Sequence, residues 1–166
     1  MRRHLHLALA AALLPLLASA AWAARGPATP EEREKLVSVV AQLEREPLAA
    51  SAVESRQWVL SFLQEVPDIT AKQCLGLFGP PQERQGIAQE LALQQLFSNA
   101  AYVVANGAPA GSTEALTAGL EGALRVYEAM KVADAKATHP RLEQLLQLQR
   151  DGQLVPYVRA VGRGCR

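Results

Sequence analysis

This 166-residue sequence contains two cysteines, Cys74 and Cys165. Their number and their spacing limit the chemistry that they can perform. A redox-active thiol pair normally has Cys-x-x-Cys spacing, which the sequence lacks. Two cysteines this far apart also lack the close ligand spacing of a zinc site, so we predict no metal and no cofactor. Two thiols in an oxidising compartment have one possible intramolecular pairing. We therefore predict a structural Cys74–Cys165 disulfide.

The sequence offers few candidates for proton transfer or nucleophilic attack. His139 is the one histidine beyond the first six residues, and a histidine can act as a base near neutral pH. Its place between Thr138 and Pro140 is more typical of a helix start. A serine nucleophile would need this same histidine, and the sequence has no Gly-x-Ser-x-Gly motif. We predict no catalytic residue.

Acidic residues leave an enzymatic alternative open, because two of them could converge in the fold as an acid–base pair. Glu121 lies four residues before Arg125, and Glu31 lies four residues before Lys35. This order favours ion pairs on an exposed helix surface. The other carboxylates considered for a cleft are Glu65, Asp68, Glu90 and Glu128.

Aromatic residues make up 5% of the chain, so most of them are expected in the core. We assign Trp58 and Phe62 to the core. A tyrosine hydroxyl needs a hydrogen-bond partner or water, which makes tyrosines good candidates for a binding groove. The candidate binding residues are Tyr102, Tyr127 and Tyr157.

Residues 1–23 have the pattern of a secretory signal peptide. Arg2 and Arg3 precede an apolar run over residues 5–17, and residues 18–24 that follow are small except for Trp22. Signal peptidase accepts small side chains at the third and first positions before the cut, which allows cleavage after Ala20 or Ala23. We favour Ala23, although an uncleaved membrane anchor is the alternative. The prediction is a periplasmic or secreted protein with a single domain at 24–166.

Charge and hydropathy limit the partners of the mature chain. Without Arg2 and Arg3 it has 15 basic and 16 acidic side chains. Such a balance gives no electrostatic reason to bind nucleic acid. No second long apolar run follows residue 24, so we predict no stable membrane insertion after cleavage.

Apolar residues recur at helical spacing through most of residues 30–161, and no stretch alternates as a strand does. Thr29 and Ser51 are each followed three residues later by glutamate, as in a capping box. A short helix is predicted to end at residue 78, with Asp68 or Thr70 as its N-cap. The other helices are predicted at residues 30–46, 51–66, 81–105, 112–136 and 140–151, and near Pro156.

These elements predict an all-α fold, a compact irregular bundle of about six or seven helices with one disulfide. The two longest helices, at 81–105 and 112–136, are expected to pack antiparallel. Ala115, Gly119 and Ala123 follow each other at intervals of four residues. This row of small residues predicts a close helix crossing.

Two segments carry a resemblance to known proteins. Residues 65–77, with the sequence EVPDITAKQCLGL, and residues 120–129, with LEGALRVYEA, resemble segments of small exported bacterial proteins that are themselves uncharacterised. The resemblance implies an exported helical domain and brings no activity. Cys74-Leu75-Gly76 and Cys165 are also similar in placement to the cysteines of exported immunity proteins that neutralise cell-wall amidases.

We therefore expect an exported, non-enzymatic helical protein that binds a protein partner or a small ligand. One alternative is a small exported enzyme with carboxylates in a cleft. Another is an immunity-like or inhibitor-like partner of a secreted cell-wall hydrolase, which would need an exposed apolar patch as its interface.

Overall fold

The computed structural model describes residues 25–165, which form an all-α bundle of six helices without strands, as predicted. The predicted signal peptide lies outside these residues. No helix among them is long and apolar enough to span a bilayer. The elements are α1 (Pro30–Arg45), α2 (Ala52–Glu65), η1 (Leu75–Phe78), α3 (Gln89–Asn106), α4 (Thr113–Ala133), α5 (Pro140–Arg150), α6 (Leu154–Val161) and η2 (Gly162–Cys165).

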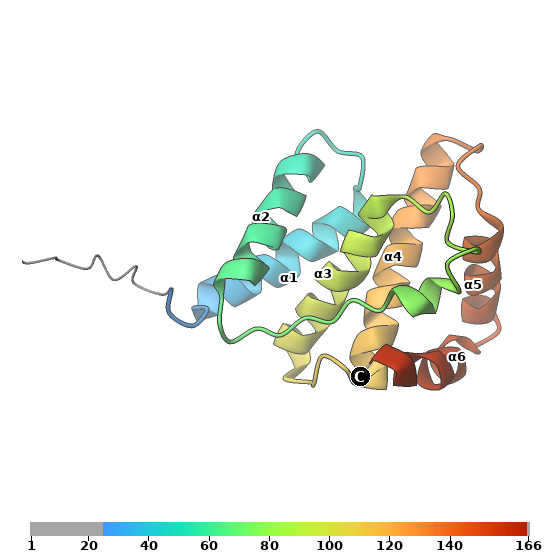
Figure 1. The fold of residues 1–166 in the computed structure, drawn as a ribbon. Helices are drawn as coiled ribbons and strands as arrows, with labels where there is room; N and C mark the ends of the chain where they lie inside the picture. The colour runs from blue at the N-terminus through green and yellow to red at the C-terminus, as the bar shows by residue number, and fades with distance from the viewer. Residues whose placement is uncertain (1–24, 166) are drawn as a thin grey trace, which may run out of the picture.

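The long helices α3 and α4 run through the middle of the bundle (Figure 1). Helices α1 and α2 lie on one side of them, and α5 and α6 on the other. Each side has its own apolar core. Leu36, Val59 and Phe97 belong to the core on the α1–α2 side, and Leu120 and Leu145 belong to the core on the α5–α6 side.

The antiparallel packing of α3 and α4 confirms the arrangement predicted for the two longest helices. Gly119 makes the close approach possible, because a Cβ atom there would lie 2.7 Å from the backbone oxygen of Gln95. Ala115 and Ala123 are also buried. The row of small residues therefore forms a close helix crossing, as predicted.

The start of α3 differs from the prediction, which placed it near Pro81. Residues 80–86 instead form successive turns, and Gly86 has a φ of +89°. A positive φ is incompatible with a right-handed helix, so the helix begins only at Gln89. Helix α4 also ends earlier than expected, at Ala133.

Two predicted helix starts have different outcomes. Thr29 caps α1 with the full capping box, because its hydroxyl accepts from the Glu32 N–H while Glu32 accepts from the Thr29 N–H. Ser51 makes no such side-chain bond, so the second capping prediction is wrong. Its backbone is already helical, with φ −76° and ψ −9°, whereas a capping side chain normally projects from extended backbone.

The aromatic assignments are partly confirmed. Phe62 is buried, but Trp58 is only half-buried and stacks on it, with 5.1 Å between ring centroids. The Lys35 ammonium lies 4.3 Å from the centre of the Trp58 ring. Trp58 therefore lies at the edge of the core, where its face attracts a cation.

The short helix predicted to end at Phe78 is present only as the 3-10 helix η1, and the segment between α2 and η1 is not helical. Asp68 accepts a hydrogen bond from the Ala28 N–H instead of capping a helix, and the chain coils across α3 as far as Cys74. Two buried amides of α3 hold it there. Asn99 accepts from the Lys72 N–H at 2.8 Å, and the Gln95 amide bonds both the N–H and the C=O of Cys74.

This arrangement brings Cys74 to the end of the chain, where it forms the predicted disulfide with Cys165. The two Cα atoms are 5.6 Å apart and the residues are separated by 91 positions in the sequence. The bond joins the residue before η1 to the last residue of η2, so the C-terminal tail is fixed to the middle of the fold.

We predict that Cys165→Ser lowers the free energy of unfolding by about 4 to 5 kcal/mol, because the unfolded chain loses the constraint of a long loop. This variant keeps the buried Cys74 side chain. Denaturant unfolding of the variant, the oxidised protein and the reduced protein measures the effect. Intact mass should show a gain of two hydrogens on reduction. Two free thiols in protein taken from the exporting cell, or unchanged stability on reduction, would contradict the prediction.

Candidate functional site

Two of the three candidate tyrosines use their hydroxyls inside the fold. The Tyr127 hydroxyl donates to Glu143 at 2.7 Å and accepts from the His139 N–H at 2.8 Å. Burial is the main cause that raises the pKa of Tyr127 above its usual value. The Tyr157 hydroxyl donates to the Leu77 carbonyl, and burial also raises its pKa. Both hydroxyls form hydrogen bonds between different elements of the fold.

Tyr102 has a different environment from the other two tyrosines. It is half-buried on α3 and lines a hollow of about 230 Å³ between α1, α3 and α4. Glu44 and Arg125, which also line this hollow, bind each other at 2.9 Å. The structure therefore does not bring the three tyrosines together in one groove, and their binding role stays a prediction.

His139 holds two segments together at the start of α5. Its Nε2 atom lies 3.0 Å from the Gln85 carbonyl, and its backbone N–H donates to Tyr127. Its Nδ1 atom is buried and has no hydrogen-bond partner among the described residues. A catalytic histidine normally has a carboxylate that orients the ring. The contacts that His139 makes are those of a structural residue.

Of the carboxylates considered for a cleft, Glu65 and Asp68 form ion pairs, and carboxylates outside that set also bind nearby cations. Arg125 binds Glu44 on another helix, so the expected pair with Glu121 does not form. The Glu143 carboxylate accepts from Lys131 at 2.6 Å and from Tyr127, and these hydrogen bonds lower its pKa. Residues 25–165 contain no group of three or more potential metal ligands.

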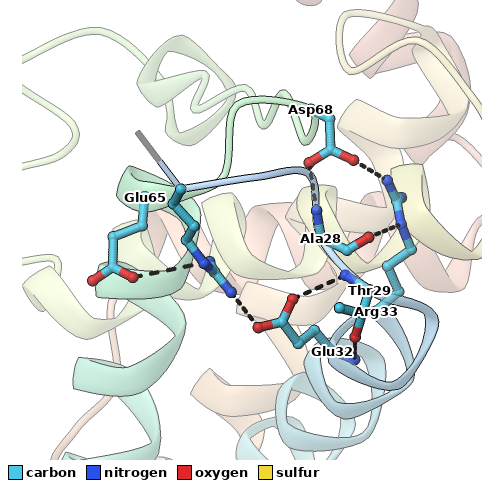
Figure 2. A network of polar contacts seen from close by, with 7 residues as sticks. Ala28, Thr29, Glu32, Arg33, Glu65 and Asp68 are labelled. Atoms are coloured by element: carbon cyan, nitrogen blue, oxygen red, sulfur yellow. Dashed lines mark hydrogen bonds and ion pairs between the residues drawn. The ribbon is translucent and has the colours of Figure 1, made fainter. Parts of the chain in front are cut away.

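The largest group of charges ties the start of the described chain to the segment after α2 (Figure 2). Arg25 lies between Glu32 and Glu65, while Arg33 pairs with Asp68. The Ala28 N–H donates to Asp68 at 2.9 Å. This hydrogen bond is the main cause that lowers the pKa of Asp68, and Arg33 adds to it. The network stabilises the N-terminal end of α1.

An apolar surface lies where the turn between α1 and α2 meets α4. We call it the turn patch: Pro47, Leu48, Ala49, Ala129 and Val132 line a hollow of about 480 Å³. Leu48 is 60% exposed and Val132 is 90% exposed. The turn and the C-terminal end of α4 lie at the same end of the molecule (Figure 1).

Sequence reasoning missed the turn patch. Val132 lies outside the apolar stripe of α4. An apolar residue on the polar face of a helix is a sign of an exposed apolar surface, and this was the one sign in the sequence. Leu48 stands alone in a turn beside Pro47, where a single apolar residue has no informative pattern. Only the packing of α1 against α4 shows that the two side chains share a hollow.

Comparison of the chain with protein-family models, curated proteins and solved structures gives no match. The resemblance to small exported bacterial proteins and to immunity proteins therefore remains a prediction from the residues.

We predict that Asp68→Ala lowers the free energy of unfolding at pH 7, and that this difference shrinks as the pH falls below about 4. The folded-state pKa of Asp68 lies below its unfolded value. The stabilisation is therefore complete above the unfolded pKa and is lost as the pH falls through the folded one. Urea unfolding at pH 7 and at low pH measures it.

The control is Glu34→Ala, an exposed position of α1 in the same region. It should leave stability nearly unchanged at both pH values. A difference between Asp68→Ala and the unmodified protein that stays constant with pH would contradict the role given to this carboxylate.

Proposed function

We propose that this chain is an exported, non-enzymatic helical protein, periplasmic or secreted, that binds a protein partner through the turn patch. The observation that carries the proposal is the exposure of Val132 and Leu48 over one hollow. Large apolar side chains that gather on an open surface are typical of protein interaction sites.

The backbone that carries the turn patch is held in place by contacts within the fold. The Arg56 guanidinium donates to the Pro47 carbonyl at 2.6 Å and so fixes the turn. Ala129 and Val132 lie on α4, whose other face is buried in the core. A surface that is already ordered loses little conformational entropy on binding, which favours affinity. Arg45 and Glu46 provide the charged rim that is usual around an apolar centre.

Export is supported by two observations of different kinds. Residues 1–23 have the features of a signal peptide. The Cys74–Cys165 disulfide suits an oxidising compartment, because thiols in the cytosol are normally kept reduced. We infer that the leader directs the chain to the compartment in which this bond forms.

The state of the carboxylates favours binding over catalysis. Glu44, Glu143 and Asp68 each bind a different cation, and the pKa values of Glu143 and Asp68 are lowered. A general acid at neutral pH needs a raised pKa, so these two acids are poorly suited to proton donation. The enzymatic alternative is therefore the less supported one.

An inhibitor-like or immunity-like protein of a secreted cell-wall hydrolase is a more specific form of this proposal. It requires an exposed apolar interface, and the turn patch is such a surface. Under this alternative the partner is an exported hydrolase, and occupation of the patch lowers its activity.

We predict that a photoreactive amino acid at position 132 forms a discrete cross-linked adduct in the exported fraction of the native host. The matched control is position 114, which is exposed at the opposite end of α4. The partner, identified by mass spectrometry of the adduct, should bind a Leu48→Asp/Val132→Asp variant at least tenfold more weakly. The variant should keep its unfolding midpoint because both side chains are exposed.

Identical adducts from positions 132 and 114, or none from position 132, would contradict binding through the turn patch. Recovery of the chain from the cytosol with residues 1–23 intact would contradict export. If the partner is a cell-wall hydrolase, loss of its inhibition by the double variant separates the inhibitor alternative from binding without inhibition.

A further inference from the structure

A second apolar hollow lies beside η1 and shares no lining residue with the turn patch. We call it the loop groove; its volume is about 410 Å³, within the usual range for small-molecule sites. Leu75, at the rim, is 41% exposed, while Phe78 is buried. Its apolar lining residues are Leu75, Phe78, Pro81, Ile87, Ala88 and Ala92.

The charge that lines the loop groove is positive. Arg84 is the one charged residue of its lining, beside the neutral Gln85 and Gln89. Arg84 makes no ion pair with a described residue, and its Nε atom is buried without a hydrogen-bond partner. An anion in the groove could pair with the guanidinium of Arg84, because guanidinium groups bind carboxylates with charge-assisted hydrogen bonds.

No carboxylate of the described residues forms an ion pair with this cation. Glu83 is engaged with Arg141 at 3.4 Å, and Glu90, in the first turn of α3, does not line the loop groove. The N-cap of α3 is Ala88, which has no side chain to accept from the first-turn N–H groups. The first residues of α3 line the groove together with Arg84, so the positive end of the α3 dipole also lies at the groove.

Three contacts fix residues that line or adjoin the loop groove. The Cys74–Cys165 disulfide fixes the residue before η1. Arg141 donates to the carbonyl of Phe78, a lining residue, at 3.3 Å. The Nε2 atom of His139 lies 3.0 Å from the carbonyl oxygen of Gln85, another lining residue. A groove formed in advance binds a flexible ligand with a smaller loss of entropy.

We propose that the loop groove binds a free medium-chain carboxylate, an aliphatic chain with one anionic head. The apolar walls cover the chain, and Arg84 holds the head at the start of α3. Charge complementarity selects this ligand over a neutral or cationic amphiphile of equal length. The site is independent of the proposed binding of a protein partner through the turn patch.

Sodium decanoate, titrated into ¹⁵N-labelled, disulfide-intact protein and followed by amide chemical shifts, tests the assignment. Shifts should saturate and centre on Leu75, Ile87 and Ala92. Decanol should bind to the same residues at least fivefold more weakly, because it lacks the charge. From octanoate to decanoate, affinity should rise by up to roughly fourfold per added methylene.

Arg84→Gln separates recognition of the head from that of the chain. It should reduce the affinity for decanoate to that for decanol and leave decanol binding unchanged. The matched control is Arg159→Gln, which removes the same charge from an exposed position of α6 outside the groove. Absence of saturation, shifts centred elsewhere, or equal losses for decanoate and decanol in Arg84→Gln would overturn the proposal.

Discussion

Two buried amide side chains on α3 are the contacts on which the rest of the structure depends. Gln95 and Asn99 are almost fully buried, which is costly for an amide unless its hydrogen bonds are made. The Gln95 side chain accepts from the backbone N–H of Cys74 and donates to its backbone C=O, which are the two bonds that a neighbouring β-strand would make. Asn99 accepts from the Lys72 N–H and donates to the Ala110 carbonyl. One helix thus fixes a coil segment and the turn before α4.

The α3–α4 crossing, the disulfide and η1 are all connected to these contacts. The Gln95 backbone lies against Gly119, so the helix that holds the segment also packs closely against α4. Cys74, held by Gln95, lies where the disulfide can join it to Cys165 and fix the tail. η1 begins at the next residue and forms one wall of the loop groove. The turn patch, on the other core, depends on the packing of α1 against α4.

Much of the fold could be predicted because apolar stripes and caps are local signals. The stripes of α1, α2 and α5 and the cap at Thr29 are legible in the sequence, and two cysteines allow one disulfide. Gln95 and Asn99 were missed because polar residues on a helix normally face solvent. Arg125 was assigned to its own helix, yet its partner Glu44 is 81 residues away. The turn patch combines residues distant in sequence, and the loop groove is formed mainly by a segment of turns, so helical periodicity shows neither hollow.

We expect α3 to hold the segment before η1 as firmly as it holds its own backbone. Native-state hydrogen exchange at the Lys72 and Cys74 amides tests this directly, because neither residue lies in a helix. We expect both amides to be protected to a degree comparable with the central amides of α3, and only with Gln95 and Asn99 intact. Exchange at the rate of an unstructured peptide would contradict the account.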